Sequence, residues 1–303
     1  MKKKILEKLL IILFTVAVLL NPVALTGTAN ATEGGGGAYA NGADDFMMGA
    51  LPPPGTYFIN YLSYYTASDF KDNNGNNLIP DFKLDVVADV FRFIHVTKYK
   101  IFGANWGMHT MIPLVYPDVT AGGQSDDRFG LGDIVVDPLI LAWHSKNFHV
   151  VTGVDIIVPV GTYDKDRQVN IGRNYWTFEP IIGITYLSDS GFELSGKFMY
   201  DFNTKNDDTE YKSGQEFHFD YTVGYHINNQ WTAGIAGYYY HQMTEDEING
   251  AKIDDFEGSV FAAGPVVQYA YKNMNVTLKW LPEFEARNRP EGDTFWLKFT
   301  YAF

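Results

Sequence analysis

The sequence predicts an all-β fold, a closed antiparallel transmembrane β-barrel of about twelve strands. Three features indicate this. Apolar side chains alternate with polar or small ones in segments of about ten to fourteen residues, the connections are long and short in turn, and aromatic residues gather near the ends of the apolar faces.

The alternation gives each strand two unlike faces. Phe192 and Leu194 alternate with Glu193 and Lys197, and the same pattern recurs in residues 216–223. Since successive side chains of a strand point to opposite faces, one face is apolar and the other is charged. A soluble β-sandwich can show the same alternation, so alternation alone does not decide between the two folds.

In residues 82–96 the same reasoning assigns an orientation. Leu84 and Val86 fall on the apolar face, which we expect to meet lipid, while Asp85 and Asp89 fall on the polar face. The polar face is expected to line the lumen.

The connections separate a membrane barrel from a sandwich. Long loops at 66–81, 117–130, 161–173, 204–214 and 244–257 alternate with tight turns, the first of them near Lys98. Outer-membrane barrels have an even number of strands, short periplasmic turns and longer extracellular loops. The expected strands are 56–66, 82–96, 101–116, 131–143, 148–160, 174–187, 192–203, 215–227, 231–243, 258–271, 275–285 and 293–303.

Three parts of the chain are expected. Residues 1–31 carry early lysines, an apolar run from Leu9 to Leu20 and a small-residue site ending at Ala31, as a cleaved Sec-type signal peptide does. The run is too short for a spanning helix, which needs about 20 residues. Residues 32–54 are a Gly- and Pro-rich periplasmic leader or partial plug, and residues 55–303 form the barrel. The expected location is the bacterial outer membrane.

Composition excludes several classes of protein. Taking four lysines and one glutamate of the signal from 23 basic and 36 acidic residues leaves 19 and 35, a net charge of −16. Such a chain lacks the basic clusters that nucleic acid requires. The absence of cysteine excludes disulfides and thiolate metal sites, and no later run is apolar enough for a membrane helix.

The charged faces predict a lumen, because an ionised side chain facing lipid at the bilayer midplane costs about 2–4 kcal/mol. If the lumen is open, the protein is a passive channel. If the charges pair across it, the protein is a plugged structural or adhesive barrel. The predicted lumen residues are Asp85, Asp89, Asp133, Asp137, Asp155, Glu179, Glu193, Asp201, Glu216, Asp220, Glu283 and Glu285, with Lys83, Lys197, Lys279, Arg287, Lys298, His218, Tyr238, Tyr240 and Trp296.

Catalytic motifs are missing from the sequence. There is no G-x-S-x-G elbow, no H-E-x-x-H helix and no complete phosphate-binding glycine loop, so we expect neither an enzyme nor a cofactor or metal. The alternative is an outer-membrane lipid-modifying enzyme with a Ser–His pair on its outer face. We expect His95, His109, His149 and His218 to point inward, which argues against that alternative.

Several partners are expected at the surface. The acidic loops could bind cations that bridge the phosphates of outer-membrane lipids and lipopolysaccharide, although no EF-hand spacing is present. The terminal aromatic Phe303 resembles the signal read by the barrel-assembly machinery.

Short motifs along residues 39–303 carry a family resemblance. They include Gly49-Ala50-Leu51-Pro52-Pro53-Pro54-Gly55-Thr56-Tyr57, Gly130-Leu131-Gly132-Asp133, Pro159-Val160-Gly161-Thr162-Tyr163 and Asn170-Ile171-Gly172-Arg173-Asn174-Tyr175-Trp176. The chain resembles the MetA-pathway of phenol degradation (SphA-type) family of outer-membrane transporters. The resemblance implies passive uptake of small hydrophobic or aromatic solutes and no catalytic residues.

An acidic lumen fits such solutes poorly, so we expect a separate apolar path near the extracellular side. Ligand sites of this kind are lined by aromatic residues with few polar groups. The expected lining residues are Phe91, Phe93, Tyr175, Tyr238, Tyr240 and Trp296.

Overall fold

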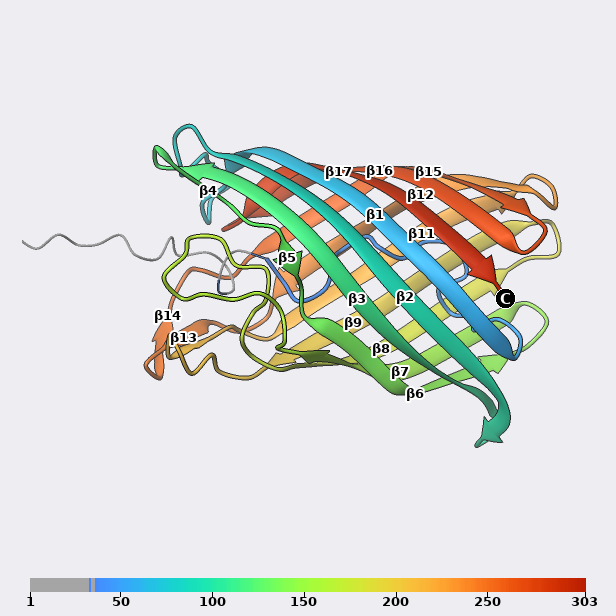
Figure 1. Ribbon diagram of the computed structural model, residues 1–303. Helices are drawn as coiled ribbons and strands as arrows, with labels where there is room; N and C mark the ends of the chain where they lie inside the picture. Colours follow the sequence, from blue (N-terminus) through green and yellow to red (C-terminus); the bar gives the residue numbers. More distant parts are fainter. Residues whose placement is uncertain (1–32, 34–35) are drawn as a thin grey trace, which may run out of the picture.

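A computed structural model describes residue 33 and residues 36–303 of the chain. The predicted signal peptide, residues 1–31, lies outside them. Among the described residues, twelve long antiparallel strands form a closed barrel (Figure 1), which confirms the predicted fold. They are β1 (Gly55–Phe70), β2 (Lys83–Ile101), β3 (Ala104–Ala121), β6 (Ile134–His144), β7 (Phe148–Val158), β8 (Thr177–Leu187), β9 (Phe192–Asn203), β11 (Glu216–His226), β12 (Trp231–Gln242), β15 (Ser259–Tyr271), β16 (Met274–Arg287) and β17 (Pro290–Ala302).

The barrel closes through β1, which pairs with both β2 and β17. Tyr61 lies opposite Val90 on one side and Lys298 on the other. Each remaining strand pairs with its neighbours around the ring. Closure leaves no sheet edge in hydrocarbon, where each unpaired backbone group would cost several kcal/mol.

The two rims of the barrel differ. Tight turns and the chain end at Phe303 occupy one rim, the short-turn rim, and most long loops occupy the other, the long-loop rim (Figure 1). The long loops add β4 (Gln124–Asp127) and β5 (Gly130–Leu131), which pair with β3. They also add a small separate sheet of β10 (Tyr211–Lys212), β13 (Asp246–Ile248) and β14 (Ala251–Ile253).

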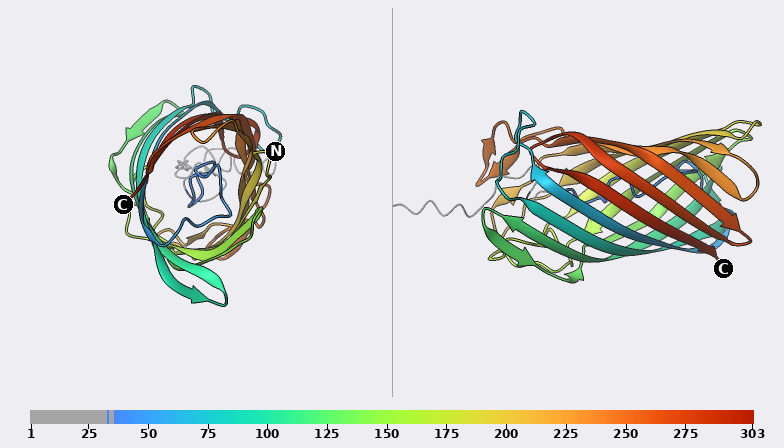
Figure 2. Two further views of the ribbon diagram at one scale, coloured as in Figure 1. Left: turned by 90° about the vertical axis from the view of Figure 1, so that its right-hand side faces the viewer. Right: turned by 90° about the horizontal axis from the view of Figure 1, so that it is seen from above.

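The turn expected near Lys98 lies further along the chain. The β2–β3 hairpin continues to the pair Ile101 and Ala104, and Phe102 and Gly103 form the turn with φ values of 50° and 78°. A side chain at Gly103 would have open space, but its positive φ favours glycine, and Phe102 is 89% exposed. The hairpin projects sideways from the barrel wall (Figure 2, left).

The first three strands are longer than a membrane crossing requires. β1, β2 and β3 have 16, 19 and 18 residues, whereas β8 has 11. Since about 9–11 residues suffice to cross the bilayer, β1–β3 extend past it at the long-loop rim.

This extension corrects the predicted orientation of β2. Asp85 and Asp89 face outward rather than into the lumen: the Tyr64 hydroxyl donates to Asp85 at 2.7 Å, and Asn60 donates to Asp89. Lys83, the ion-pair partner of Asp85 at 2.6 Å, is also outside. These polar groups are tolerated because the outer half of β2 lies beyond the hydrocarbon.

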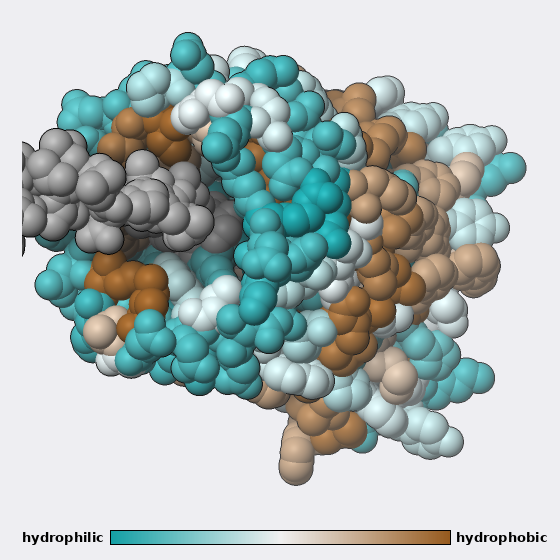
Figure 3. Space-filling view, turned by 60° about the vertical axis from the view of Figure 1, so that its left-hand side comes forward, coloured by the Kyte–Doolittle hydropathy of each residue, from teal (hydrophilic) through white to brown (hydrophobic). Residues whose placement is uncertain are grey.

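An apolar belt surrounds the rest of the barrel. Ile182, Phe198 and Leu278 are 51%, 41% and 52% exposed toward the middle of their strands. Trp231 packs on Tyr269 with ring centroids 4.7 Å apart, near one end of the belt. Figure 3 shows apolar side chains on this part of the surface and hydrophilic ones over the long-loop rim. No helix among the described residues is long and apolar enough to cross a membrane.

The belt predicts where a lipid-facing charge is costly. Ile182→Lys places an ammonium at the centre of the 11-residue β8 and should lower the free energy of unfolding in lipid vesicles by about 2–4 kcal/mol. Val87→Lys, between the outward Asp85 and Asp89, should cost about 1 kcal/mol or less. Denaturant titrations followed by tryptophan fluorescence measure both, and equal costs would mean that the belt covers the outer half of β2.

Candidate functional site

The barrel lumen is where the predicted charged residues meet. The structure places most of them inward, with 9% exposure or less: Asp133, Asp137, Asp155, Glu179, Glu193, Lys197, Asp201, Glu216, His218, Asp220, Tyr238, Tyr240, Lys279, Glu283, Trp296 and Lys298.

Glu285 and Arg287 do not belong to this set. Both are exposed, although strict alternation from the buried Glu283 would turn them inward. The pairing of β15 with β16 shifts register between Ser259 and Phe261, and Glu285 has a φ of 55°. Such a β-bulge inserts one residue and reverses the alternation beyond it, so Ala286 is buried instead.

The leader lies inside the barrel. Residues 36–54 run through the lumen (Figure 2, left). The Asp220 carboxylate accepts hydrogen bonds from the Gly42 and Asp44 amides at 2.8 and 3.0 Å, and Glu193 accepts one from the Met47 amide at 2.6 Å. Acidic wall residues thus satisfy the backbone of a segment that has no regular secondary structure.

The leader enters at the long-loop rim and leaves at the short-turn rim. The Glu33 carboxylate accepts hydrogen bonds from Asn206 at 2.9 Å and Thr209 at 2.6 Å, both in the β9–β11 loop. At the other end the chain enters β1, where the Phe303 amide donates to the Thr56 carbonyl at 3.1 Å. The leader therefore runs the length of the lumen.

Two leader carboxylates neutralise the cations of the wall. Asp45 is 3.3 Å from the Lys279 ammonium and also binds Lys298. Asp44 lies 3.2 Å from Lys197 and 3.8 Å from Arg92.

The pKa of Asp44 reflects this arrangement. Burial alone would raise it, but Lys197, Arg92 and Lys298 outweigh burial and hold the pKa well below its usual range. Asp44 therefore stays ionised and keeps its ion pairs over the whole neutral range.

An apolar cavity of about 420 Å³ lies above the leader at the long-loop rim. One wall is formed by the inward faces of β2 and β3. For β2, this is the face that the sequence assigned to lipid. Tyr238 and Trp296 line the cavity as expected. The apolar lining is Tyr65, Phe70, Ile79, Phe82, Leu84, Val86, Ala88, Val90, Pro113, Val115, Pro117, Val119, Ala121, Ile157, Val169 and Ile171.

Other residues of the expected apolar path lie elsewhere. Phe91 and Phe93 face outward and contact Phe58, with ring centroids 6.3 and 5.2 Å away. Tyr175 and Tyr240 are buried but do not line the cavity. The predicted inward direction of Phe91 and Phe93 is wrong for the same reason as that of Asp89. All three residues lie on the face of β2 that the sequence assigned to the lumen and that faces outward.

A few polar groups mark one corner of the cavity. The Glu283 carboxylate accepts hydrogen bonds from the hydroxyls of Tyr65, at 2.8 Å, and Tyr238, and from the Gly292 amide at 2.8 Å. Arg289 lies over the Tyr240 ring, 4.5 Å from its centroid. Asp133, Gln168, Asn170 and Arg173 also line the cavity. The cavity thus combines a long apolar wall with a limited number of polar groups, as small-molecule sites do.

The enzyme alternative finds no support in the geometry. His95 faces outward, against expectation, and its Nδ1 lies 3.0 Å from the Thr56 hydroxyl. His109 and His218 are inward and paired with carboxylates. Among the hydrogen bonds of the described residues, none joins a serine hydroxyl to a histidine ring.

The fold has relatives among solved structures. An outer membrane channel from Pseudomonas putida F1 superposes with a TM-score of 0.78 at 17% identity, covering 86% of this chain and 99% of its own. The transport unit of the autotransporter AIDA-I from Escherichia coli gives 0.50 at 9% identity, covering 85% and 94%. A search of curated proteins found no match.

An apolar exterior, a charged interior and a closed ring of strands define a porin-like outer-membrane barrel. Residues 67–299 match the family described as "Putative MetA-pathway of phenol degradation". The match spans more than half of the chain, so the protein belongs to this family, and the resemblance seen in the sequence is confirmed.

We call the ion pairs of Asp45 with Lys279 and Lys298 the leader clamp. The leader clamp can be tested by removing its carboxylate. Asp45→Asn leaves Lys279 and Lys298 without a charge partner, and breaking a buried pair costs about 3–5 kcal/mol. We expect a protease to cleave residues 36–54 faster in the folded variant than in folded wild type, with the cleavage monitored by mass spectrometry.

A surface pair serves as the control for this variant. Asp189→Asn removes the exposed partner of Lys146, an ion pair that solvent screens, and should leave the cleavage rate unchanged. Equal rates in wild type and Asp45→Asn would show that the clamp does not hold the leader.

Proposed function

We propose that this barrel mediates passive uptake of small hydrophobic or aromatic solutes across the bacterial outer membrane. The observation that carries the proposal is the cavity of about 420 Å³, whose longest wall is apolar. That volume lies in the range of about 300–1,000 Å³ typical of small-molecule sites. The name of the family, which refers to phenol degradation, supports the same substrate class.

The polarity of the lumen favours such solutes at its entrance. The inward surface there is apolar and offers a polar or charged solute no hydrogen-bond or charge partner. It is formed by Leu84, Val86, Val115 and Val119. Burying apolar surface contributes about 25 cal/mol per Å², so a ring-sized solute gains affinity there without a charged anchor. Selectivity would then arise at the long-loop rim, before the solute meets the charged part of the lumen.

We further propose that residues 1–31 direct Sec-type export and that the barrel-assembly machinery reads Phe303. Outer-membrane lipids and lipopolysaccharide would then surround the apolar belt. The first assignment rests on the signal-like sequence, the second on the terminal aromatic residue, and the third on the belt.

The apolar wall can be tested with two adjacent residues on opposite faces of β2. Val86→Asn should lower the uptake of a small aromatic solute such as toluene about tenfold, because it removes about 1.5 kcal/mol of apolar contact. Val87→Asn faces outward and should leave uptake unchanged. Uptake into proteoliposomes measures both, and equal rates would place the solute path elsewhere.

The leader clamp favours the second candidate, a plugged structural barrel. The two candidates differ in single-channel conductance across a planar bilayer. If the leader partly fills an open path, wild type should show small, salt-dependent steps, and deletion of residues 36–54 should enlarge them severalfold, because the lumen loses its central segment.

Silence from wild type together with large steps from the deletion variant would favour the plugged barrel. Heat-dependent gel mobility verifies that the deletion variant folds. Silence from both folded proteins would contradict any channel through this lumen.

A further inference from the structure

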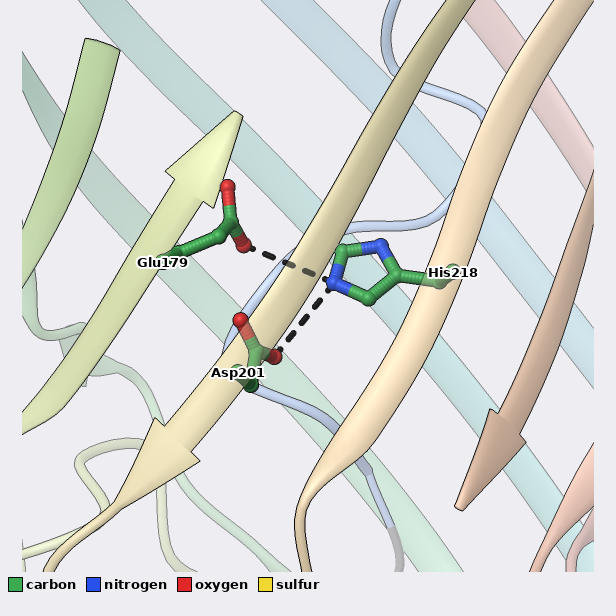
Figure 4. Close-up of side chains that lie close together, drawn as sticks. All are labelled: Glu179, Asp201 and His218. Atoms are coloured by element: carbon green, nitrogen blue, oxygen red, sulfur yellow. Dashed lines mark ion pairs between the residues drawn. The ribbon is translucent and has the colours of Figure 1, made fainter. Parts of the chain in front are cut away.

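Three buried side chains converge on the lumen wall where β8, β9 and β11 lie side by side (Figure 4). The Nε2 atom of His218 is 3.5 Å from a carboxylate oxygen of Glu179 and 3.4 Å from one of Asp201. All three residues are 1% exposed or less. One ligand atom from each lies within 4.8 Å of the others. We call this group the Glu179–Asp201–His218 cluster.

The polar atoms of the cluster have no hydrogen-bond partners. This holds for both carboxylate oxygens of Glu179, both of Asp201, and both ring nitrogens of His218. A buried polar group without a partner costs about 1–3 kcal/mol, and more when it is charged. His218 is thus a buried imidazole without a hydrogen bond, at ion-pair distance from two carboxylates that have no hydrogen bond either.

The charge around the cluster is also unbalanced. In the strand register Asp155 lies opposite Glu179, and Glu216 lies opposite Asp201, which makes a row of carboxylates across four strands. Lys197, which lies outside this row, has its ammonium 3.9 Å from Asp155 and 3.2 Å from Asp44 of the leader. Among the ion pairs of the described residues, none joins a lysine or arginine to Glu179 or Asp201.

We propose that the Glu179–Asp201–His218 cluster binds a divalent transition-metal ion of the zinc type. Tetrahedral coordination with bonds of 2.0–2.2 Å separates neighbouring ligand atoms by about 3.3–3.6 Å. The two distances to His218 Nε2, 3.5 and 3.4 Å, fall in this range and are long for hydrogen bonds.

The donor set selects among metal ions. Mg²⁺ and Ca²⁺ prefer all-oxygen sites, whereas an imidazole with carboxylates suits Zn²⁺ and its neighbours. Three protein ligands leave a position for water. The ion would cross-link β8, β9 and β11 beneath the leader, where the Tyr39 ring lies 5.2 Å from the His218 ring. This site does not depend on the proposed transport.

Metal content tests the proposal directly. The full-length mature protein is refolded in detergent without lipopolysaccharide, which itself binds cations, and is then stripped with EDTA and titrated with Zn²⁺. We expect about one Zn²⁺ per chain by elemental analysis and calorimetry. His218→Gln should weaken binding at least about 100-fold, since loss of a group that only supports a ligand already costs 10–100-fold.

A second histidine gives a matched control. His226 forms a 2.6 Å contact with a single carboxylate, Glu193, so His226→Gln should keep the Zn²⁺ affinity of wild type. If His218→Gln does not fold by heat-dependent gel mobility, Asp201→Asn and Glu179→Gln should each lower the affinity instead.

The proposal is overturned if folded wild type binds none of Zn²⁺, Co²⁺, Ni²⁺ and Mn²⁺. It is equally overturned if the ligand variants and His226→Gln bind Zn²⁺ alike. The cluster would then be held together by protons shared among its own groups.

Discussion

A strand that crosses hydrocarbon can carry ionised side chains on one face only, and this constraint governs the molecule. Closure of the sheet satisfies the backbone and sends every charged face to the same interior. The interior then holds more charge than its own wall can pair. Asp44 and Asp45 of the leader, together with leader amides, supply the partners that Lys197, Lys279, Lys298 and Asp220 need.

The same constraint divides the lumen. Along β7–β12 the inward face is charged and the leader packs against it, whereas toward the long-loop rim the inward faces of β2 and β3 are apolar and a cavity remains. Long strands make this inversion possible, because the outer half of β2 stands beyond the bilayer and can turn Asp85 and Asp89 to solvent. The leader therefore fills one side of the lumen, and the cavity proposed to take the solute lies on the other side.

Most of the fold could be predicted from the sequence, because alternation and loop rhythm depend only on neighbouring residues. The inward direction of Glu193, Asp201 and His218 follows from the charge of their face alone. The direction of β2 could not be predicted, since an apolar face fits both lipid and an apolar cavity. The bulge at Glu285 has no evident signal in the sequence either. The contact of Asp45 with Lys298 joins residues 253 positions apart in a segment without periodicity.

The path of the leader has a topological consequence. Glu33 is held by the β9–β11 loop at one rim, and β1 begins at the other, so the polypeptide is threaded through a ring that its own residues complete. A ring cannot be threaded easily after it is sealed, because Glu33 and its loop contacts would have to pass a lumen already filled with side chains. We therefore expect the leader to be in place before the last pair of strands joins, with residues 36–54 as the core around which the wall closes.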